Sequence, residues 1–448
     1  MEFLAIAFAG VLGNICSILS LSTTSTGWFN SLCSPGDISS VLGPHLSSGA
    51  HIYLPGSDQF TQATTRWSAY QAPNFTVIVK VATESDVGET VKYANKQNIP
   101  FIAVNGGHGA IRSLEDGKTA TIGGGALSKQ ITDSLWTKGK QTVTGICECT
   151  SLLGPGLGGG HGILQGRYGL IADQFVSLNV VLANGSLITV GEESDLWWGL
   201  KGAGHNFGII TSATTKIYDV PDDGVWSYIR FIYTHDKVED LYEAINTHLL
   251  KNGTQPVDFF SYSLFFNLPS LDPDHSLIAF FILQGGTASV ESQYADPFKK
   301  MGPVMMKGDH GSFKDIAKWT DMATDSPPSL NNSFFLFEGY SVQGVQSIPS
   351  DSTAFPHREA NLLVAPVVTY EPGDKKLESE AFQFGETLRE IIFQGSDEKE
   401  MYSYVNYASG NEGPQSWYGY EPWRLEKLRV LKEKYDPDNR LSFYAPFV

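Results

Sequence analysis

Three glycine-rich stretches restrict the fold of this chain more than any other feature of its sequence. The first is Asn105-Gly106-Gly107-His108-Gly109, and it directly follows the apolar run Ile99–Val104, which predicts a short buried strand. Three glycines in five residues let the backbone turn sharply and bring its N–H groups close to an anion such as a pyrophosphate. Taken alone, the pentapeptide also fits an ordinary turn with an incidental histidine.

The other two stretches strengthen the ligand-binding interpretation. The second runs from Gly145 to Asp173, and the third runs from Gly202 into the apolar strand that contains Ile210. Each glycine costs backbone entropy in a regular helix or strand, so such a density of glycine is not typical of either. We therefore expect these stretches to allow close approach to something flat or anionic.

Together the motifs resemble the flavin-dependent oxidoreductases of the vanillyl-alcohol-oxidase superfamily, in the berberine-bridge-enzyme-like branch and its fungal secondary-metabolite members. The resemblance runs from about Leu46 to Pro446 and includes the late motif Tyr404-Val-Asn-Tyr407. It implies an α+β fold with a PCMH-type FAD-binding domain over residues 40–220. An antiparallel-sheet substrate domain with helices on one face would follow over 221–395, and a C-terminal segment over 396–448 would return to the FAD domain.

The resemblance also implies a covalently bound FAD. The histidine of the Gly-Gly-His turn, His108, would carry the flavin and raise its redox potential. An ungapped count back from Tyr168 places a possible second, thioether link on Cys147, although strand alternation would put Cys149 on the same face. A buried free thiol or a vicinal redox pair is the alternative for these cysteines. The residues predicted to bind FAD are His108, Cys147, Asn105, Gly106, Gly107, Gly109, Gly154, Gly158, Gly159, Gly160, Gly162, Asn206, Gly208, Ile209 and Asn439.

Hydride removal from a carbon that bears a hydroxyl group needs a base for the hydroxyl proton. The resemblance points to Tyr404 and Tyr407 as the catalytic candidates. A phenol has a pKa near 10, so a neighbour would have to lower it for the phenol to act as a base at neutral pH. Alternatively, both are core aromatics on opposite faces of a strand. For His161, inside the second glycine stretch, we expect packing rather than catalysis.

The charge balance excludes some partners. With 48 acidic and 31 basic residues among 448, the net charge is −17, which argues against nucleic acid and anionic lipid as partners. The apolar opening Phe3–Leu21 is too interrupted for a stable membrane insertion and predicts a signal peptide over residues 1–21, with a buried N-terminal helix as the alternative. Four N-glycosylation sequons, at Asn74, Asn184, Asn252 and Asn331, support a secreted or vesicular protein.

Hydrophobic patterns predict the main elements of both domains. In the first domain they predict a strand over Thr76–Val81, a helix from Thr83 to Asn95, and a hairpin over Phe175–Val190 closed by Asn184-Gly185. In the second, a helix over Leu377–Phe393 is expected to turn Ala381, Phe384, Leu388 and Ile391 inward. Strands are predicted there over Val257–Phe266, Ser276–Leu283, Ser333–Glu338 and Asn361–Tyr370.

One departure from the resembled family affects the functional prediction. Family members usually have some thirty more residues after the Gly-Gly-His turn, whereas here Ala110–Leu114 leads directly into Glu115-Asp-Gly117. The shortening is either genuine or the result of mis-splicing. The sequence thus predicts an FAD-linked oxidase that acts on a small organic substrate and is reoxidised by O₂. A carbohydrate oxidase of the same superfamily and a non-catalytic flavin or metabolite binder are the alternatives.

Overall fold

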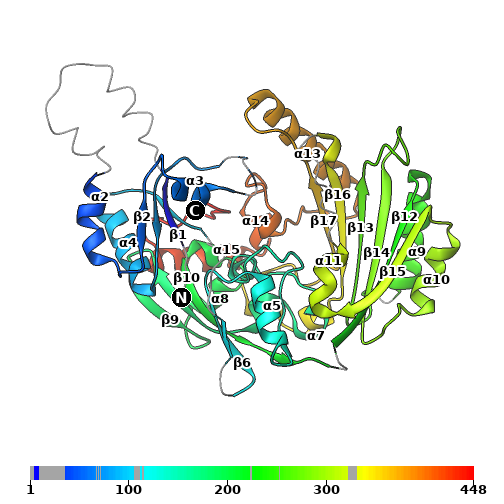
Figure 1. The fold of residues 1–448 in the computed structure, drawn as a ribbon, viewed down its shortest axis with the longest axis horizontal. Coiled ribbons are helices and arrows are strands. Elements are labelled where there is room, and N and C mark those ends of the chain that lie inside the picture. The colour runs from blue at the N-terminus through cyan, green and yellow to red at the C-terminus, as the bar shows by residue number, and fades with distance from the viewer. Residues whose placement is uncertain are drawn as a thin grey trace.

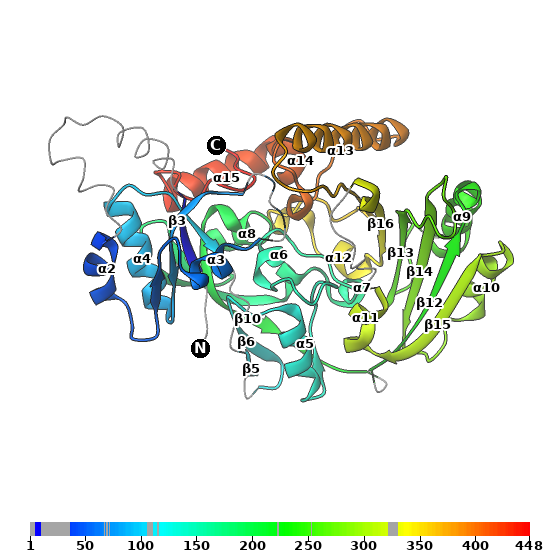
Figure 2. The ribbon, with the colours of Figure 1, turned by 45° about the horizontal axis from the view of Figure 1, so that its top comes forward.

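The protein has two lobes, each built around its own β-sheets, with the C-terminal segment running between them (Figure 1, Figure 2). The computed structural model describes residues 5–9, 36–66, 68, 70, 72–104, 111–113, 116–221, 224–251, 253–320 and 330–448. The predicted flavin turn, Asn105–Gly109, lies outside these residues. The α+β class predicted from the sequence is confirmed.

The first lobe begins with a four-stranded sheet in the order β2-β3-β1-β4. Helix α4 packs on this sheet and begins at a capping box in which Thr83 and Asp86 satisfy each other's backbone amides. Val87, Val91 and Ala94 form its buried face, as predicted. The strands are β1 (Ala5–Ala9), β2 (His51–Tyr53), β3 (Phe75–Lys80) and β4 (Phe101–Val104), and the helices are α2 (Gly36–Val41), α3 (Asp58–Thr64) and α4 (Glu84–Lys96).

Strand β1 comes from the segment for which the sequence predicted a signal peptide. It is an inner strand, antiparallel to β3 on one side and to β4 on the other. The alternative of an N-terminal helix is wrong over these five residues, because they are extended and paired. Among the described residues β4 pairs only with β1. Since β4 ends directly before the Asn105–Gly109 segment, β1 is the backbone support of the strand that precedes this segment.

A second, five-stranded sheet in the order β5-β6-β10-β8-β9 completes the first lobe. The shortened segment after Gly109 supplies β5, in which Ile111 pairs with Ile122 of β6. The predicted hairpin is confirmed as β8 and β9, and Gly185 takes a left-handed φ of 81° at its turn. The strands are β5 (Ile111–Ser113), β6 (Thr119–Gly123), β8 (Phe175–Leu182), β9 (Leu187–Val190) and β10 (Gly208–Lys216), with β7 (Lys140–Gln141) and β11 (Tyr218–Asp219) forming a separate pair. The helices of this part are α5 (Ser128–Trp136), α6 (Leu153–Leu157), α7 (Gln165–Tyr168) and α8 (Leu196–Leu200).

The second lobe is a six-stranded antiparallel sheet in the order β15-β12-β14-β13-β16-β17. Helices α9 and α10 cover its outer face (Figure 1), and Phe231, Phe280 and Phe298 pack between the sheet and these helices. The four strands predicted from the sequence are confirmed as β13, β14, β16 and β17. The strands are β12 (Val225–Tyr233), β13 (Phe259–Phe266), β14 (Leu277–Gly285), β15 (Met305–Ser312), β16 (Phe334–Tyr340) and β17 (Leu362–Val367), and the helices are α9 (Val238–Ala244), α10 (Ser292–Lys300), α11 (Ile316–Thr320) and α12 (Gln343–Gln346).

Helix α13, Lys375–Gly395, shows one error of the sequence-based prediction. Of its four residues expected to face inward, Ala381 is buried, but Phe384 and Ile391 are 51% and 59% exposed. The helix contacts β17 and lies along the top of the molecule in Figure 2. A 3.6-residue period finds the apolar stripe of a helix but does not show how much of that stripe a neighbour covers.

The C-terminal helices α14 (Pro414–Tyr418) and α15 (Pro422–Tyr435) follow, and α15 packs against α8 of the first lobe. The buried ammonium group of Lys432 on α15 donates to the Asn206 carbonyl oxygen at 2.8 Å. A buried ion pair, Arg358 Nη2 to Asp173 Oδ1 at 2.9 Å, ties the segment after β16 to the end of the second glycine stretch. Within the described ranges no helix is both long and apolar enough to cross a membrane.

Candidate active site

A buried carboxylate with two tyrosine partners is the most distinctive group in the structure. Glu338 lies near the end of β16 and is 6% exposed. The Tyr407 hydroxyl donates to its Oε2 at 2.9 Å, and the Tyr340 hydroxyl donates to its Oε1 at 3.2 Å. Burial raises the pKa of Glu338 to about 7, and these two hydrogen bonds offset part of the rise. A carboxyl group with a pKa near neutrality can accept or release a proton under ordinary conditions.

The two predicted catalytic tyrosines lie side by side, not on opposite faces. The segment is a 3₁₀ turn over Val405–Tyr407 and not a strand, so the ring centroids of Tyr404 and Tyr407 are 5.2 Å apart. Burial raises the pKa of Tyr404 to about 12, and burial with the Glu338 charge raises the pKa of Tyr407 further. Neither phenol therefore has the lowered pKa that a base would need, and of these three groups only Glu338 has a pKa close to neutrality.

His161 lies against this cluster as a packed, neutral ring. Its imidazole stacks on Tyr340 at 5.2 Å and meets Tyr404 edge-on at 4.7 Å. Burial lowers the pKa of His161 to about 4, and its Nδ1 is 2.9 Å from Gln165 Oε1. The His161 amide donates to the Tyr404 hydroxyl oxygen at 3.3 Å, and the Asn406 side chain donates to the same oxygen at 2.6 Å. The packing role expected for His161 agrees with these contacts.

The glycines of the second stretch are packed against protein atoms. A Cβ added to Gly158 would lie 2.3 Å from Asn406 Oδ1, and one added to Gly159 would lie 2.5 Å from the Phe355 ring. The corresponding distance for Gly162 is 2.3 Å, to the carbonyl oxygen of Thr144. Close packing of the protein therefore accounts for these glycines without a ligand. Contacts from this stretch to FAD, including those expected of Gly154 and Gly160, stay predictions.

The remaining predicted FAD residues are divided between core and loop. Asn206 is buried, and its side-chain amide donates to the Tyr418 hydroxyl oxygen at 3.1 Å. Ile209 belongs to the core beneath α4, and a Cβ on Gly208 would meet Val180 at 2.3 Å. Asn439 lies in the loop after α15 with a left-handed φ of 50°. The third glycine stretch thus anchors strand β10 and the C-terminal segment.

Cys147 and Cys149 lie together in an exposed turn rather than in the strand assumed from the sequence. The Thr150 amide donates to the Cys147 carbonyl oxygen at 3.3 Å and closes this turn. A hydrogen bond with Cys147 is the main cause that raises the pKa of Cys149 to about 11. Because the thiolate is the nucleophilic form, this environment disfavours Cys149 as a flavin anchor. Cys147 is also close enough to Tyr407 to contribute to the raised pKa of that phenol.

Comparison with known proteins assigns the family. A family model described as an FAD binding domain matches residues 109–191. An FAD-linked oxidoreductase of Penicillium rubens, chyH, is 43% identical over 463 aligned positions that cover 90% of this chain and 92% of the relative. This chain belongs to the FAD-linked oxidoreductases. A second member, chry5 of Gibberella zeae, is 41% identical, and the alignment covers 91% of this chain and 94% of the relative. The chain is therefore an FAD-dependent oxidoreductase.

Solved structures agree on the fold of this FAD-linked oxidoreductase. A berberine-bridge-enzyme-like protein of Physcomitrella patens superposes with a TM-score of 0.72 at 18% identity and covers 91% of this chain and 98% of its own. The 6-hydroxy-D-nicotine oxidase of Arthrobacter nicotinovorans gives 0.71 at 18% identity, covering 90% and 98%. The Penicillium alignment is longer than the 448 residues of this chain, so that relative has residues that this enzyme lacks.

Polar atoms left without partners fit a flavin cofactor in the first lobe. Within the described ranges Gln165 Nε2 and Ser128 Oγ are buried and have no hydrogen-bond partner. Buried polar groups normally have one, and the flavin ring and ribityl chain offer several acceptors and donors. Ser128 lies beside the turn after β6, and Gln165 lies within the second glycine stretch.

Sequence analysis missed Glu338 and Tyr340. The only signal was a lone acidic residue at the end of the aromatic run Phe334–Phe337, where an unpaired charge would be costly to bury. The run predicts a strand, and a strand pattern does not show which group satisfies its carboxylate. The carboxylate and its two hydroxyl donors come from residues 338, 340 and 407, and no sequence motif joins these three positions.

Proposed function

We propose that this FAD-linked oxidoreductase is an oxidase that removes a hydride from a hydroxyl-bearing carbon of a small secondary metabolite. Bound FAD would accept the hydride at N5 and be reoxidised by O₂. The observation that carries the proposal is the Glu338 carboxylate, which is buried, close to neutral pKa, and hydrogen-bonded to Tyr407. Membership of an enzyme family favours this function over the non-catalytic binder considered from the sequence.

Tyr407 and Glu338 would move the substrate proton as a pair. The Tyr407 hydroxyl oxygen accepts the proton of the substrate hydroxyl while its own proton passes across the 2.9 Å hydrogen bond to Glu338 Oε2. The phenol ends neutral, which agrees with its raised pKa, and the negative charge of Glu338 is neutralised. The Tyr340 hydroxyl keeps the carboxylate oriented through Oε1. Tyr404 is held by Asn406 and the His161 amide, so its role would be to shape the site.

We further propose that the flavin is covalently held. His108 would carry it, since this histidine belongs to the glycine-rich segment Asn105–Gly109, which follows the strand that ends at Val104. Cys147 would make any second link, since Cys149 is held in its thiol form and Cys147 is the one near Tyr407.

Single-turnover kinetics test the proton-transfer assignment. We expect Glu338→Gln and Tyr407→Phe each to slow anaerobic flavin reduction by about 10²–10⁴-fold, the usual contribution of a positioned base. In the wild type this rate should rise with pH up to about 7, where Glu338 becomes ionised, and then level off. Tyr402→Phe is the matched control, because Tyr402 is 53% exposed and contacts His357 and Tyr420 instead of Glu338. Unchanged reduction in Glu338→Gln would remove the carboxylate from the mechanism.

A substrate panel tests the substrate class and the oxidant. Peroxide release with small aromatic or alicyclic alcohols, and none with mono- or oligosaccharides, is the expected result. Release with the sugars alone would establish the carbohydrate-oxidase alternative. Flavin reduction without peroxide release in air would show that O₂ is not the electron acceptor, while leaving the assignment of Glu338 intact.

We also propose that the chain enters the secretory pathway. The apolar opening and the sequons support this, and of the described sequon asparagines Asn74 and Asn184 are both exposed. Cleavage of residues 1–21 would remove β1, so a molecule that has lost its signal peptide cannot have β1 in the sheet. N-terminal sequencing of exported protein would decide which form is made.

A further inference from the structure

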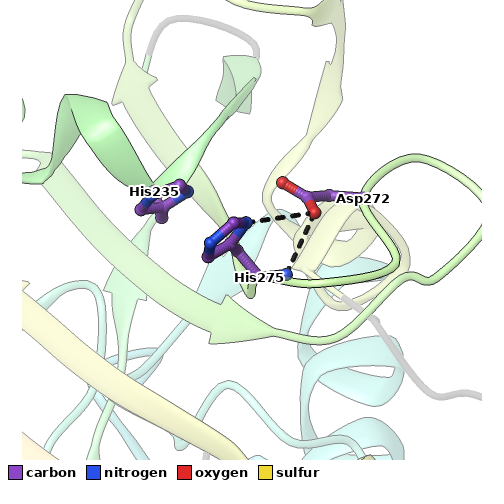
Figure 3. Close-up of side chains that lie close together, drawn as sticks. All are labelled: His235, Asp272 and His275. Atoms are coloured by element: carbon purple, nitrogen blue, oxygen red, sulfur yellow. Dashed lines mark hydrogen bonds and ion pairs between the residues drawn. The ribbon is translucent and has the colours of Figure 1, made fainter.

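Two histidines and an aspartate converge at one end of the six-stranded sheet. His235 begins the turn after β12, and Asp272 and His275 lie in the loop between β13 and β14 (Figure 3). The antiparallel register brings them together, since Tyr233 at the end of β12 pairs with Ile278 near the start of β14. Tyr340 of β16 pairs with Phe260 of β13, and Phe260 in turn pairs with Leu283 of β14. Leu283 lies near the opposite end of β14 from Ile278. The cluster is therefore separate from the active site.

The geometry of the cluster suits a single ion. One ligand atom of each of the three side chains lies within 4.8 Å of those of the other two. The His235 and His275 rings are stacked with centroids 3.9 Å apart, and His275 Nδ1 is 3.4 Å from Asp272 Oδ1. Metal bonds of about 2.0–2.2 Å hold ligand atoms roughly 3–4 Å apart, so rotation of the two exposed histidine rings out of their stacked arrangement would close the site.

The aspartate is held in place by its own loop. The amides of Asp274 and His275 donate to Asp272 Oδ1, each at 3.0 Å. The loop is further closed by Ser276, whose hydroxyl donates to Asn267 Oδ1 at 2.7 Å. A carboxylate held by its own loop beside two stacked imidazoles is more ordered than a chance gathering of surface side chains.

The donor set selects the class of ion. Two imidazole nitrogens and one carboxylate oxygen suit zinc and its first-row neighbours, whereas Mg²⁺ and Ca²⁺ prefer sites made entirely of oxygen. Three protein ligands leave one tetrahedral position for water. We propose that His235, Asp272 and His275 form a surface site for a divalent transition metal of the zinc class, which fastens the β13–β14 loop to the end of β12.

Zinc titration of the purified full chain, without an affinity tag, tests this proposal. The titration uses the Cys147→Ser, Cys149→Ser background, because two neighbouring exposed thiols would also bind zinc. We expect one equivalent of Zn²⁺ to bind and to raise the melting temperature. His235→Ala and His275→Ala should each weaken binding by at least about tenfold, given that even outer-sphere partners of a metal contribute 10–100-fold. His310→Ala is the matched control, since His310 is also exposed and also lies beside an aspartate, Asp309.

Several outcomes would overturn the site. Absence of a stoichiometric Zn²⁺ site in the Cys147→Ser, Cys149→Ser background would do so, as would equal weakening by His310→Ala. Ca²⁺ or Mg²⁺ binding as tightly as Zn²⁺ would show a non-specific acidic surface instead. Co²⁺ absorption gives an independent readout, because a tetrahedral site with nitrogen and oxygen ligands has visible bands that should disappear in His275→Ala while the circular dichroism spectrum stays unchanged.

Discussion

Removal of strand β1 tests how the FAD-binding lobe is held together. The register joins five residues of β1 to β3 and four to β4. An antiparallel ladder has close to one hydrogen bond for each residue pair, so deletion would remove roughly nine bonds. At about 0.5–1.5 kcal/mol net for each bond, the loss is about 5–13 kcal/mol. That is comparable to the whole free energy of unfolding of a typical domain, about 5–15 kcal/mol.

We therefore expect a chain that lacks residues 1–21 to melt at least about 10 °C below the full chain. It should also bind less flavin, because β4 loses its one described partner immediately before the His108 turn. The assay is thermal melting by circular dichroism together with the ratio of flavin to protein absorbance. Both chains are expressed in the cytosol, so that no signal peptidase acts on them.

Two variants separate pairing from simple shortening. Deletion of residues 1–4 leaves β1 in place and should change nothing. Ala7→Pro keeps the length but removes a backbone donor at the residue paired with Ile78 and Ile102, and it should reproduce most of the destabilisation. A chain lacking residues 1–21 that melts with the full chain and carries equal flavin would refute the reasoning, and would support cleavage of this segment as a signal peptide.

Three further predictions concern the flavin and Glu338. His108→Ala should lose acid-stable flavin, measured by the visible spectrum after acid precipitation, and full retention through any link other than a cysteine would contradict the assignment. Mass spectrometry of tryptic peptides should place any second link on Cys147, and flavin mass on Cys149, or on neither cysteine in an active enzyme, would exclude it. Because the pKa of Glu338 rises from its ordinary 4.5 to about 7 on folding, the folded state holds its proton more tightly. Stability should fall by about 3 kcal/mol as pH rises from about 4.5 to about 7, and urea unfolding of Glu338→Gln should lack this decrease.

Local patterns sufficed where neighbours in the sequence decide the structure. The capping box at Thr83 and the Asn184-Gly185 turn depend on residues within a few positions, so their elements were predicted nearly to the residue. The fold class and the membership of the FAD-linked oxidoreductases also followed from motifs that lie in continuous stretches. The extended state of the Tyr404–Tyr407 segment was predicted wrongly, because a period of two residues cannot be recognised in so short a run.

The sequence by itself therefore determined the fold class, most elements and the cofactor. Tertiary structure alone decided which groups meet. Glu338 is a potential base only because Tyr340 and Tyr407 satisfy it in a buried site, and the pairing of β1 with β4 joins segments that lie far apart in the chain. The same holds for His235 and His275, which the register of β12 and β14 brings together. A pKa and a ligand set depend on distances in space, and a local sequence pattern does not contain those distances.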